Sequence, residues 1–319
     1  MSAPAALLPV AALLLNAFTW GVSWWPFRWL EGQGLHALWA TSLVYALSVL
    51  VIVLWRPGAP GILLRSPRLW WLIAASGITN AAFNWAVTIG DVVRVVLLFY
   101  LMPVWAVLLA RLLLGERLSA AAGLRVLLAL LGALIVLWPG AQAGHGTPST
   151  GPVSLGLSLA DVLGIVGGFS FALNNVLLRR EAAAPEEARA LAMFGGGVLV
   201  SAVLASLLWA SGRIGPPPAA ALTWLPAAGL LALAFLLGNL ALQYGAARLP
   251  ANTTAAVMVA EVLFAAVSAV ALGAGVVTWP LVLGGLLIVA ASLLSAFQGS
   301  ATIQTSPPPV GREASAGPP

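Results

Sequence analysis

Hydrophobic residues occur along this chain in long blocks, separated by short clusters of arginine, proline, glycine or other polar residues. A helix needs about 20 mostly apolar residues to cross the hydrocarbon core of a bilayer. Ten blocks reach that length, so the pattern predicts an all-α integral membrane protein of about ten transmembrane helices. The strands of an outer-membrane barrel would alternate over about 10 residues, whereas these blocks are apolar throughout. The expected spans are 7–28, 35–55, 69–90, 93–114, 119–138, 158–179, 190–210, 222–244, 251–272 and 278–297.

The composition agrees with a lipid-facing surface. Hydrophobic residues make up 61% of the chain and charged residues 7%, compared with about 25% charged residues in soluble domains. The net charge is +5, but the arginines lie singly between apolar runs and form no basic face, so we expect no nucleic-acid partner. There is no cysteine, which excludes disulfides and thiolate chemistry. His36 and His145 cannot form a metal site by themselves, and we interpret them as surface residues.

The positions of the arginines predict the orientation in the membrane, because cytoplasmic loops carry an excess of positive charge. With a cytoplasmic N-terminus, only Arg28, Arg94 and Arg213 fall on the outer side. We therefore expect both termini to be cytoplasmic. The arginines expected inside are Arg56, Arg65, Arg68, Arg111, Arg117, Arg125, Arg179, Arg180, Arg189, Arg248 and Arg312.

The second half of the sequence resembles the first. AFTWGVSWWPFR at 17–28 aligns with GFSFALNNVLLR at 168–179, and NWAVTIG at 84–90 aligns with NLALQYG at 239–245. In the same order, 103–119 aligns with 261–278. Because five spans per half is an odd number, the two copies are expected in opposite orientations, as two inverted five-helix repeats.

This repeat divides the chain into four expected parts. Residues 7–138 form the first repeat and residues 158–297 the second. A linker rich in Gly, Pro, Ser and Thr at 139–157 is expected outside the cytoplasm, and 298–319 is expected to be a disordered cytoplasmic tail. The first span reads as a retained helix and not as a secretory signal, since 1–10 carries no Lys or Arg.

Three motifs resemble the EamA-like family of the drug/metabolite transporter (DMT) superfamily. They are Trp20-Gly21 in the first span, LFYLMPVW at 98–105, and GERLS at 115–119, and the resemblance extends over residues 9–297. It implies a carrier in the bacterial cytoplasmic (inner) membrane with two five-helix repeats, often an exporter of amino acids, metabolites or drugs, usually without a cofactor. The sequence departs from the family at Ala274-Gly275, at Arg125, where a glycine is usual, and at Val262, where proline often follows the glutamate. The last departure leaves open whether the ninth span is broken there.

Glu261 is the outstanding ionisable residue, near the middle of the ninth span and far in sequence from any cation. A polar group at bilayer depth costs several kcal/mol unless it finds partners. One interpretation is a site for a substrate amine or a proton; the other is a structural glutamate bonded to nearby hydroxyls and backbone. We predict the first. Glu261 can exchange a proton against substrate as an antiporter requires, although a uniporter could use the same residue for binding alone.

Amide and hydroxyl side chains recur at helical spacing in several spans. They predict polar helix faces that line a cavity, although hydrogen bonding between helices is the alternative. The repeat would place Asn84 and Asn239 opposite each other. The candidates are Asn80, Asn84 and Thr88 in the third span, Ser23 in the first, Ser170, Asn174 and Asn175 in the sixth, and Asn239 and Gln243 in the eighth.

Aromatic side chains within the spans could form flat walls around an organic or cationic solute. We expect this of Trp20, Tyr100 and Trp105, with Trp24 and Tyr244 as further candidates. Anchoring at the membrane interface is the alternative, and we prefer it for Trp25, Trp29, Trp55, Trp70 and Trp71, which stand at span ends.

The other charged residues and the glycines have simpler interpretations. Arg94 is expected to snorkel or to pair with Asp91, and Arg111 and Arg125 to set topology. Small residues such as Gly164, Gly168 and Gly195 to Gly197 are expected to allow close helix packing.

These expectations favour a secondary transporter, acting by alternating access at a site formed by spans one, three, four, six, eight and nine. A membrane-embedded enzyme and a channel or sensor without coupled transport remain alternatives, although the sequence contains no Walker, Rossmann or nucleophile-elbow pattern. The expected partners are a small-molecule substrate, the lipid bilayer and, as a coupling ion, the proton. We expect a monomer, with a dimer as the alternative, and no cofactor.

Overall fold

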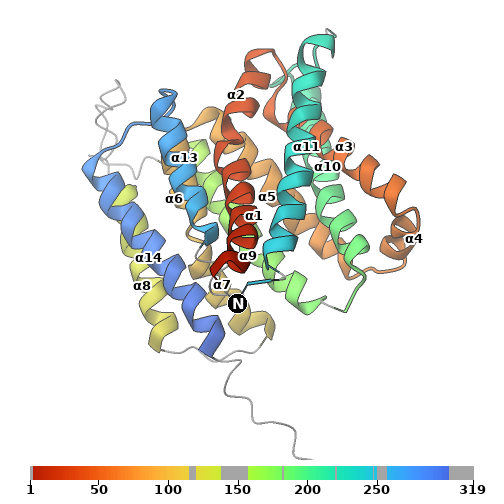
Figure 1. Cartoon of the computed structure of the whole chain (residues 1–319). Helices are drawn as coiled ribbons and strands as arrows, with labels where there is room; N and C mark the ends of the chain where they lie inside the picture. Colours follow the sequence, from red (N-terminus) through yellow and green to blue (C-terminus); the bar gives the residue numbers. More distant parts are fainter. Residues whose placement is uncertain are drawn as a thin grey trace, which may run out of the picture.

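The computed structural model describes residues 3–114, 120–137, 157–181, 183–219, 221–246, 248–249 and 257–301. Within these residues every regular element is a helix (Figure 1). In chain order the helices are α1 (Ala3–Val22), α2 (Trp24–Gly32), α3 (Ala37–Trp55), α4 (Ala59–Leu64), α5 (Leu69–Ile89), α6 (Val92–Phe99), α7 (Met102–Leu114), α8 (Ala120–Val136), α9 (Leu159–Arg180), α10 (Glu186–Ala210), α11 (Ala221–Ala246), α13 (Ala260–Ala271) and α14 (Trp279–Ala301).

Seven helical segments are long and apolar enough to cross a membrane. They are Leu7–Gly32, Ala37–Trp55, Leu69–Ile89, Val92–Leu113, Leu159–Arg180, Glu186–Ala210 and Leu222–Leu242. Shorter apolar helices at Gly123–Val136, Ala260–Ala271 and Trp279–Ala291 occupy the places of the other three predicted spans. The protein is thus a multi-pass membrane protein whose described elements are all helices. The motif at 115–119, most of the linker at 139–157 and most of the tail at 298–319 lie outside the described residues.

The helices form one bundle in which α1 begins and α14 ends at the same end (Figure 1). In the middle of the bundle α1 packs against α11 and α13, and α5 packs against α9 and α10. The α8 and α14 helices pack against each other at one side of the bundle (Figure 1). Elements from the two halves of the sequence are therefore interleaved and do not form separate domains.

Three helices are interrupted within the bundle, and proline explains two of the breaks. Pro26 cannot donate a backbone hydrogen bond to Val22, and α1 gives way to α2 at Ser23, whose hydroxyl bonds to the Trp20 carbonyl at 2.8 Å. Pro103 likewise leaves the Phe99 carbonyl without a helical donor, and α6 ends at that residue.

The third break has no proline. The Val262 backbone N–H bonds to Val259, at 3.1 Å, and not to Met258 as an uninterrupted α-helix would require. The Met258 carbonyl instead lies 3.5 Å from the hydroxyl of Tyr100. A helix therefore restarts at Ala260 although Val262 replaces the proline common in the family. This settles the question that the sequence left open.

Close helix contacts depend on glycine in the central part of the bundle. A Cβ on Gly77 or on Gly196 would collide with the backbone of the facing helix, so α5 and α10 touch at their main chains. Gly168 meets the Phe99 carbonyl in the same way. These contacts match the predicted packing role of Gly168 and Gly196, whereas Gly195 faces open space.

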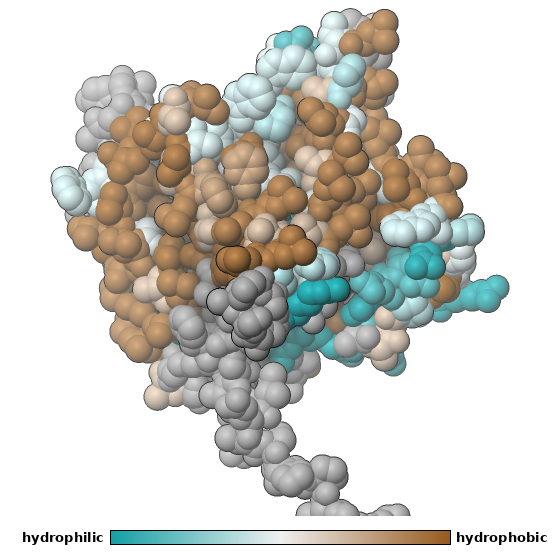
Figure 2. Space-filling view, in the orientation of Figure 1, coloured by the Kyte–Doolittle hydropathy of each residue, from teal (hydrophilic) through white to brown (hydrophobic). Residues whose placement is uncertain are grey.

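The surface is largely hydrophobic across the middle of the bundle, and hydrophilic residues gather at its lower edge on the side of α4 (Figure 2). The tryptophans expected at the interface are all exposed, with 39% to 70% of their surface accessible. Trp24 is instead buried and donates its indole N–H to Ser268 at 2.9 Å.

Arg94 has a different partner from the one predicted. Its guanidinium bonds to both oxygens of Asp161 on α9, at 2.6 and 3.1 Å, and to the Val136 carbonyl at 2.8 Å. Asp91 instead caps α6 by accepting the Arg94 backbone N–H at 2.9 Å. The sequence pointed to Asp91 because it is near in the chain, but helix packing brings Asp161 to the guanidinium.

Candidate functional site

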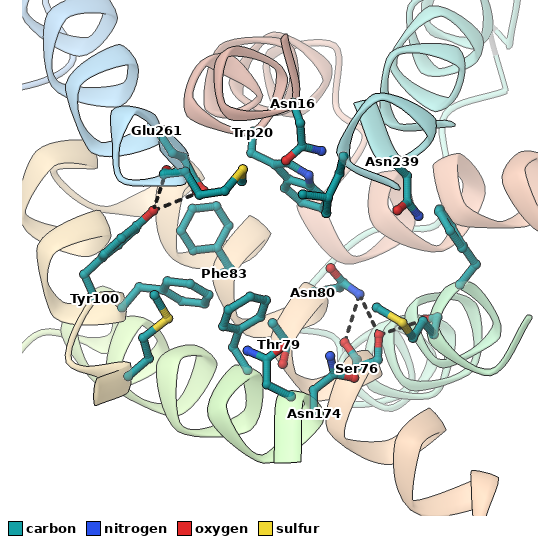
Figure 3. A pocket seen from close by; sticks show the side chains of 18 of the residues that line it. Asn16, Trp20, Ser76, Thr79, Asn80, Phe83, Tyr100, Asn174, Asn239 and Glu261 are labelled. Carbon is teal, nitrogen blue, oxygen red and sulfur yellow. Dashed lines mark hydrogen bonds between the residues drawn. The ribbon is translucent and has the colours of Figure 1, made fainter. Parts of the chain in front are cut away.

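A cavity of about 450 Å³ lies inside the bundle, a size usual for small-molecule sites (Figure 3). Helices from both halves of the sequence contribute to its wall. The lining residues that the structure describes are mostly aromatic, aliphatic or amide-bearing, and Glu261 is the only acid among these. They are Asn16, Trp20, Tyr45, Ser76, Thr79, Asn80, Phe83, Phe99, Tyr100, Met102, Phe171, Asn174, Asn175, Met193, Phe194, Asn239, Leu242, Met258, Val259 and Glu261.

One face of α5 supplies a central strip of the wall. Ser76, Thr79, Asn80 and Phe83 follow the i, i+3, i+4, i+7 spacing of a single helix face. Asn80 is held in place by Tyr45, whose hydroxyl donates to its side-chain oxygen at 2.7 Å. The Asn80 amide donates in turn to the carbonyl and hydroxyl of Ser76, at 2.9 and 3.3 Å.

Glu261 lies at the first turn of α13, directly after the break at Val259. Its side chain accepts a hydrogen bond from the Tyr100 hydroxyl at 3.2 Å, and α1 and α6 are the helices packed against α13. No salt bridge to Glu261 occurs within the described residues, where Arg94–Asp161 is the ion pair found. The site therefore presents a half-buried carboxylate, joined to a phenol, at the wall of an otherwise neutral cavity.

Aromatic rings form much of the remaining wall. Trp20 stacks on Phe235 with ring centroids 4.5 Å apart. Phe99 contacts both Phe83 and Phe171, at 4.8 and 5.4 Å between centroids. Such contacts fix the rings in place, and the cavity thereby gains rigid apolar walls.

The structure brings seven of the eleven predicted site residues to the cavity. Glu261 and Tyr100 lie on one side in Figure 3, and Asn80 and Asn239 lie across from them. The seven lining residues are Trp20, Asn80, Tyr100, Asn174, Asn175, Asn239 and Glu261.

Three of the predicted residues lie away from the cavity lining. Asn84 is fully buried and donates to the Thr41 hydroxyl at 3.1 Å, so it joins α5 to α3. Ser23 bonds within its own helix break, and the Trp105 ring packs edge-on against Phe169 at 5.5 Å. The side chain of Gln243, the eleventh candidate, is outside the described residues.

Helix geometry explains why Asn84 and Thr88 do not share the cavity-facing direction of Asn80. At 3.6 residues per turn, each step of four residues rotates the direction of a side chain by about 40°. Asn80 faces the cavity, Asn84 faces α3, and Thr88 bonds to the Trp85 carbonyl at 2.7 Å. The four-residue spacing therefore assigned more residues to the cavity-facing side of the helix than the structure places there.

The sequence did not predict that α3 and α10 would line the cavity. They contribute Tyr45, Met193 and Phe194. Asn16 was also missed, although it lies four residues before Trp20 on the same helix face and donates to the Gly238 carbonyl at 2.8 Å. A helical-face comparison around Trp20 could have found Asn16, whereas Tyr45 and Phe194 give no signal against their apolar neighbours.

Within the described residues no group of three or more His, Cys, Asp or Glu side chains could hold a metal ion. The lining offers carbonyl, hydroxyl and amide groups together with one carboxylate. The geometry therefore suits reversible binding of an organic solute.

Comparison with known proteins gives one family and one fold. Residues 7–138 match the EamA-like transporter family, and a search of curated proteins finds no match. Solved structures that match include one titled "Crystal structure of protein". It is 18% identical, with a TM-score of 0.52, and the alignment covers 92% of this chain and 99% of that chain. At that identity the likeness shows the fold alone.

The family match coincides with the motifs at Trp20-Gly21 and 98–105, which lie inside the matched residues. It confirms the resemblance on which the sequence interpretation relied. Residues 7–138 of this chain thus match the EamA-like transporter family, which is part of the DMT superfamily.

Proposed function

We propose that the protein is a secondary transporter that moves a small organic solute across the membrane by alternating access, with the Glu261 cavity as its binding site. The observation that carries the proposal is the position of this carboxylate. It stands at a helix break, on the wall of a cavity lined by both halves of the chain. Broken helices at a site between repeats are a recurrent feature of secondary transporters.

Helix packing supports an inverted repeat. If α1 is exchanged with α9, α3 with α10, α5 with α11 and the α6–α7 segment with α13, most of the main contacts map onto each other. Thus α1 packs on α11 as α9 packs on α5, and α1 packs on α13 as α9 packs on α6 and α7. Likewise α10 packs on α5 as α3 packs on α11.

Single contacts agree with the register of the sequence repeat. The alignment that pairs Ala17 with Gly168 and Asn84 with Asn239 also pairs Asn16 with Gly167 and Phe83 with Gly238. Asn16 bonds to Gly238, and a Cβ on Gly167 would lie 3.6 Å from the Phe83 backbone nitrogen. The two contacts are therefore equivalent under the exchange of halves.

The helix breaks follow the same register. Pairing Pro103 with Glu261 pairs Leu101 with Val259, and these residues stand in the turns before α7 and α13. Tyr100 and Met258 are paired as well, and they contact each other across the cavity wall. The two breaks thus lie close together near the pseudo-axis. In the proposed mechanism they act as hinges that open the cavity to one side of the membrane or the other.

In this mechanism Glu261 binds a proton and the solute in turn, which couples their movements in opposite directions. Among the ionisable side chains on the packed elements, Tyr100 bonds to Glu261, Arg94 of α6 is bound to Asp161, and α1 carries none. The carboxylate is therefore available for a ligand. Export is the proposed direction, in keeping with the family.

The proposed location is a bacterial inner membrane with both termini in the cytoplasm. The shared end of α1 and α14 and the hydrophilic lower edge of the bundle support this orientation (Figures 1 and 2). Reporter fusions after Ser2 and Gln298 should both score cytoplasmic. A periplasmic score for either fusion would contradict the topology.

Transport is tested by counterflow in proteoliposomes. Vesicles loaded with unlabelled benzyltrimethylammonium, phenylalanine or 3-phenylpropionate receive the same compound in labelled form outside. A carrier gives transient, saturable accumulation of at least one of the three. Flux that rises linearly with concentration, or that equals that of protein-free vesicles, would indicate a channel or no transport.

A further inference from the structure

The hydrogen-bond donors on the α5 face of the cavity wall, and on Tyr45 beside it, are engaged within the protein. The Tyr45 hydroxyl donates to Asn80, Ser76 donates to the Met193 carbonyl at 2.9 Å, and Thr79 donates to the Ala75 carbonyl at 2.8 Å. The Asn80 amide donates twice to Ser76. A ligand that presents only acceptors would therefore find few free donors on these side chains.

Hydrogen-bond acceptors are more available than donors, because the charged group among the described lining residues, Glu261, is an acceptor. Glu261 has two carboxylate oxygens, and Tyr100 donates to one of them. Among the described residues that line the cavity there is no arginine, lysine or histidine. A donor-bearing cation would therefore gain a charged partner here, whereas an anion would enter a low-dielectric cavity that already holds a carboxylate.

The aromatic and amide side chains of the wall determine which uncharged groups the rest of the ligand can carry. Phe83 and Trp20 lie between the Glu261 side and the Asn239 side of the cavity (Figure 3). Aromatic faces hold apolar groups and also attract a cationic head. The amides of Asn174 and Asn239 lie farther from Glu261 and can both donate to and accept from a neutral polar group (Figure 3).

From this distribution of groups we infer that the cavity takes organic ammonium compounds with an apolar or aromatic body and no carboxylate, and that it discriminates against the corresponding amino acids. The inference rests on the proposed function and narrows its substrate class. An ammonium group pairs with Glu261, the body packs among the rings, and a neutral polar end meets the amides. An amino acid places its own carboxylate in a site without a cationic partner.

Four compounds separate the two charges. Phenylalaninamide carries the amine without a carboxylate, phenylalanine carries both, 3-phenylpropionate carries the carboxylate alone, and 3-phenylpropanamide carries neither. Their affinities for the purified full-length protein in detergent are measured by titration calorimetry. We expect phenylalaninamide to bind at least tenfold more tightly than phenylalanine, and the amine to improve binding in both pairs.

The Glu261→Gln variant tests where the amine binds. It should reduce the affinity for phenylalaninamide at least tenfold and leave that for 3-phenylpropanamide within about threefold. Equal or tighter binding of phenylalanine or 3-phenylpropionate by the unaltered protein would overturn the inference, and so would an absence of binding by all four compounds. Because those measurements use the unaltered protein, the inference stays testable even if the variant fails to fold.

Counterflow of the same four compounds separates the charge selectivity of the cavity from transport itself. Saturable phenylalanine flux with no preference for the amide would retain transport and refute the charge selectivity. Selective binding of phenylalaninamide without any flux would retain the selectivity and refute transport.

Discussion

Asp161 and Glu261 are both carboxylates on helices of the membrane bundle, yet their surroundings differ. Asp161 is 2% exposed and accepts hydrogen bonds from the Arg94 guanidinium at both oxygens, and from the Ser158 backbone N–H at 2.9 Å. Glu261 faces the cavity with one hydroxyl partner, Tyr100. The first carboxylate is surrounded by donors that belong to the protein, whereas the second is left accessible.

The difference separates a structural role from a ligand-binding role. A buried charge whose partners are complete contributes to the fold, and removing one partner leaves the other charge unpaired. A carboxylate with few partners beside a cavity can bind a proton or a solute cation without breaking the fold. Asp161 is also the more deeply buried of the two carboxylates, but the clearest difference between them lies in their hydrogen-bond partners.

The largest expected effect on the free energy of unfolding comes from breaking the Arg94–Asp161 ion pair. Arg94→Ala leaves Asp161 buried without its cation, and we expect a loss of about 3–5 kcal/mol in the free energy of unfolding. The measurement is an SDS titration in mixed micelles. The Arg94→Ala/Asp161→Ala double variant should recover part of the loss, since no buried charge remains. A loss below about 1 kcal/mol for Arg94→Ala would show that the pair is not structural.

A smaller effect is expected from Tyr100→Phe, which removes the hydroxyl that bonds to Glu261. Hydrogen bonds to charged groups contribute about 1.5–3 kcal/mol, so the loss should stay below that of Arg94→Ala. Tyr45→Phe is the matched control, because its hydroxyl bonds to the neutral Asn80 side chain. If Tyr100→Phe destabilised the protein as much as Arg94→Ala, Glu261 would belong with Asp161 as a structural carboxylate.

The smallest expected effect comes from the helix cap beside Asp161. The Ser158 hydroxyl accepts the Asp161 backbone N–H at 3.2 Å and completes a capping box at the start of α9. Ser158→Ala should cost about 1 kcal/mol. Ser211, exposed at the end of α10, provides a control variant, Ser211→Ala, for which no comparable loss is expected. Equal effects of the two changes would argue against a stabilising cap.

The helices could be predicted from the sequence because hydropathy is a local property. Spans such as 69–90 and 158–179 match α5 and α9 to within about two residues. The break at Pro103 also has a local cause in the missing backbone donor. Seven of the candidate site residues lie at the cavity because polar side chains in an apolar helix tend to face the protein interior.

The remaining features depend on contacts between distant segments. The sequence gives no sign that Arg94 meets Asp161, because that pair depends on how α6 packs against α9. The break at Val259 is stabilised in part by Tyr100, which comes from another helix. The rotation that turns Asn84 from the cavity to Thr41 depends on the position of α3.

The central claim is that Glu261 couples proton movement to solute movement. The most direct test measures uptake of labelled benzyltrimethylammonium into proteoliposomes, with and without an imposed proton gradient, for the unaltered protein and for Glu261→Gln. The variant keeps the shape of the side chain and loses its titratable proton. We expect gradient-driven, pH-dependent uptake by the unaltered protein and loss of that dependence in Glu261→Gln, while its membrane level and unfolding free energy stay close to those of the unaltered protein. Unchanged pH-dependent uptake by the variant would contradict the account.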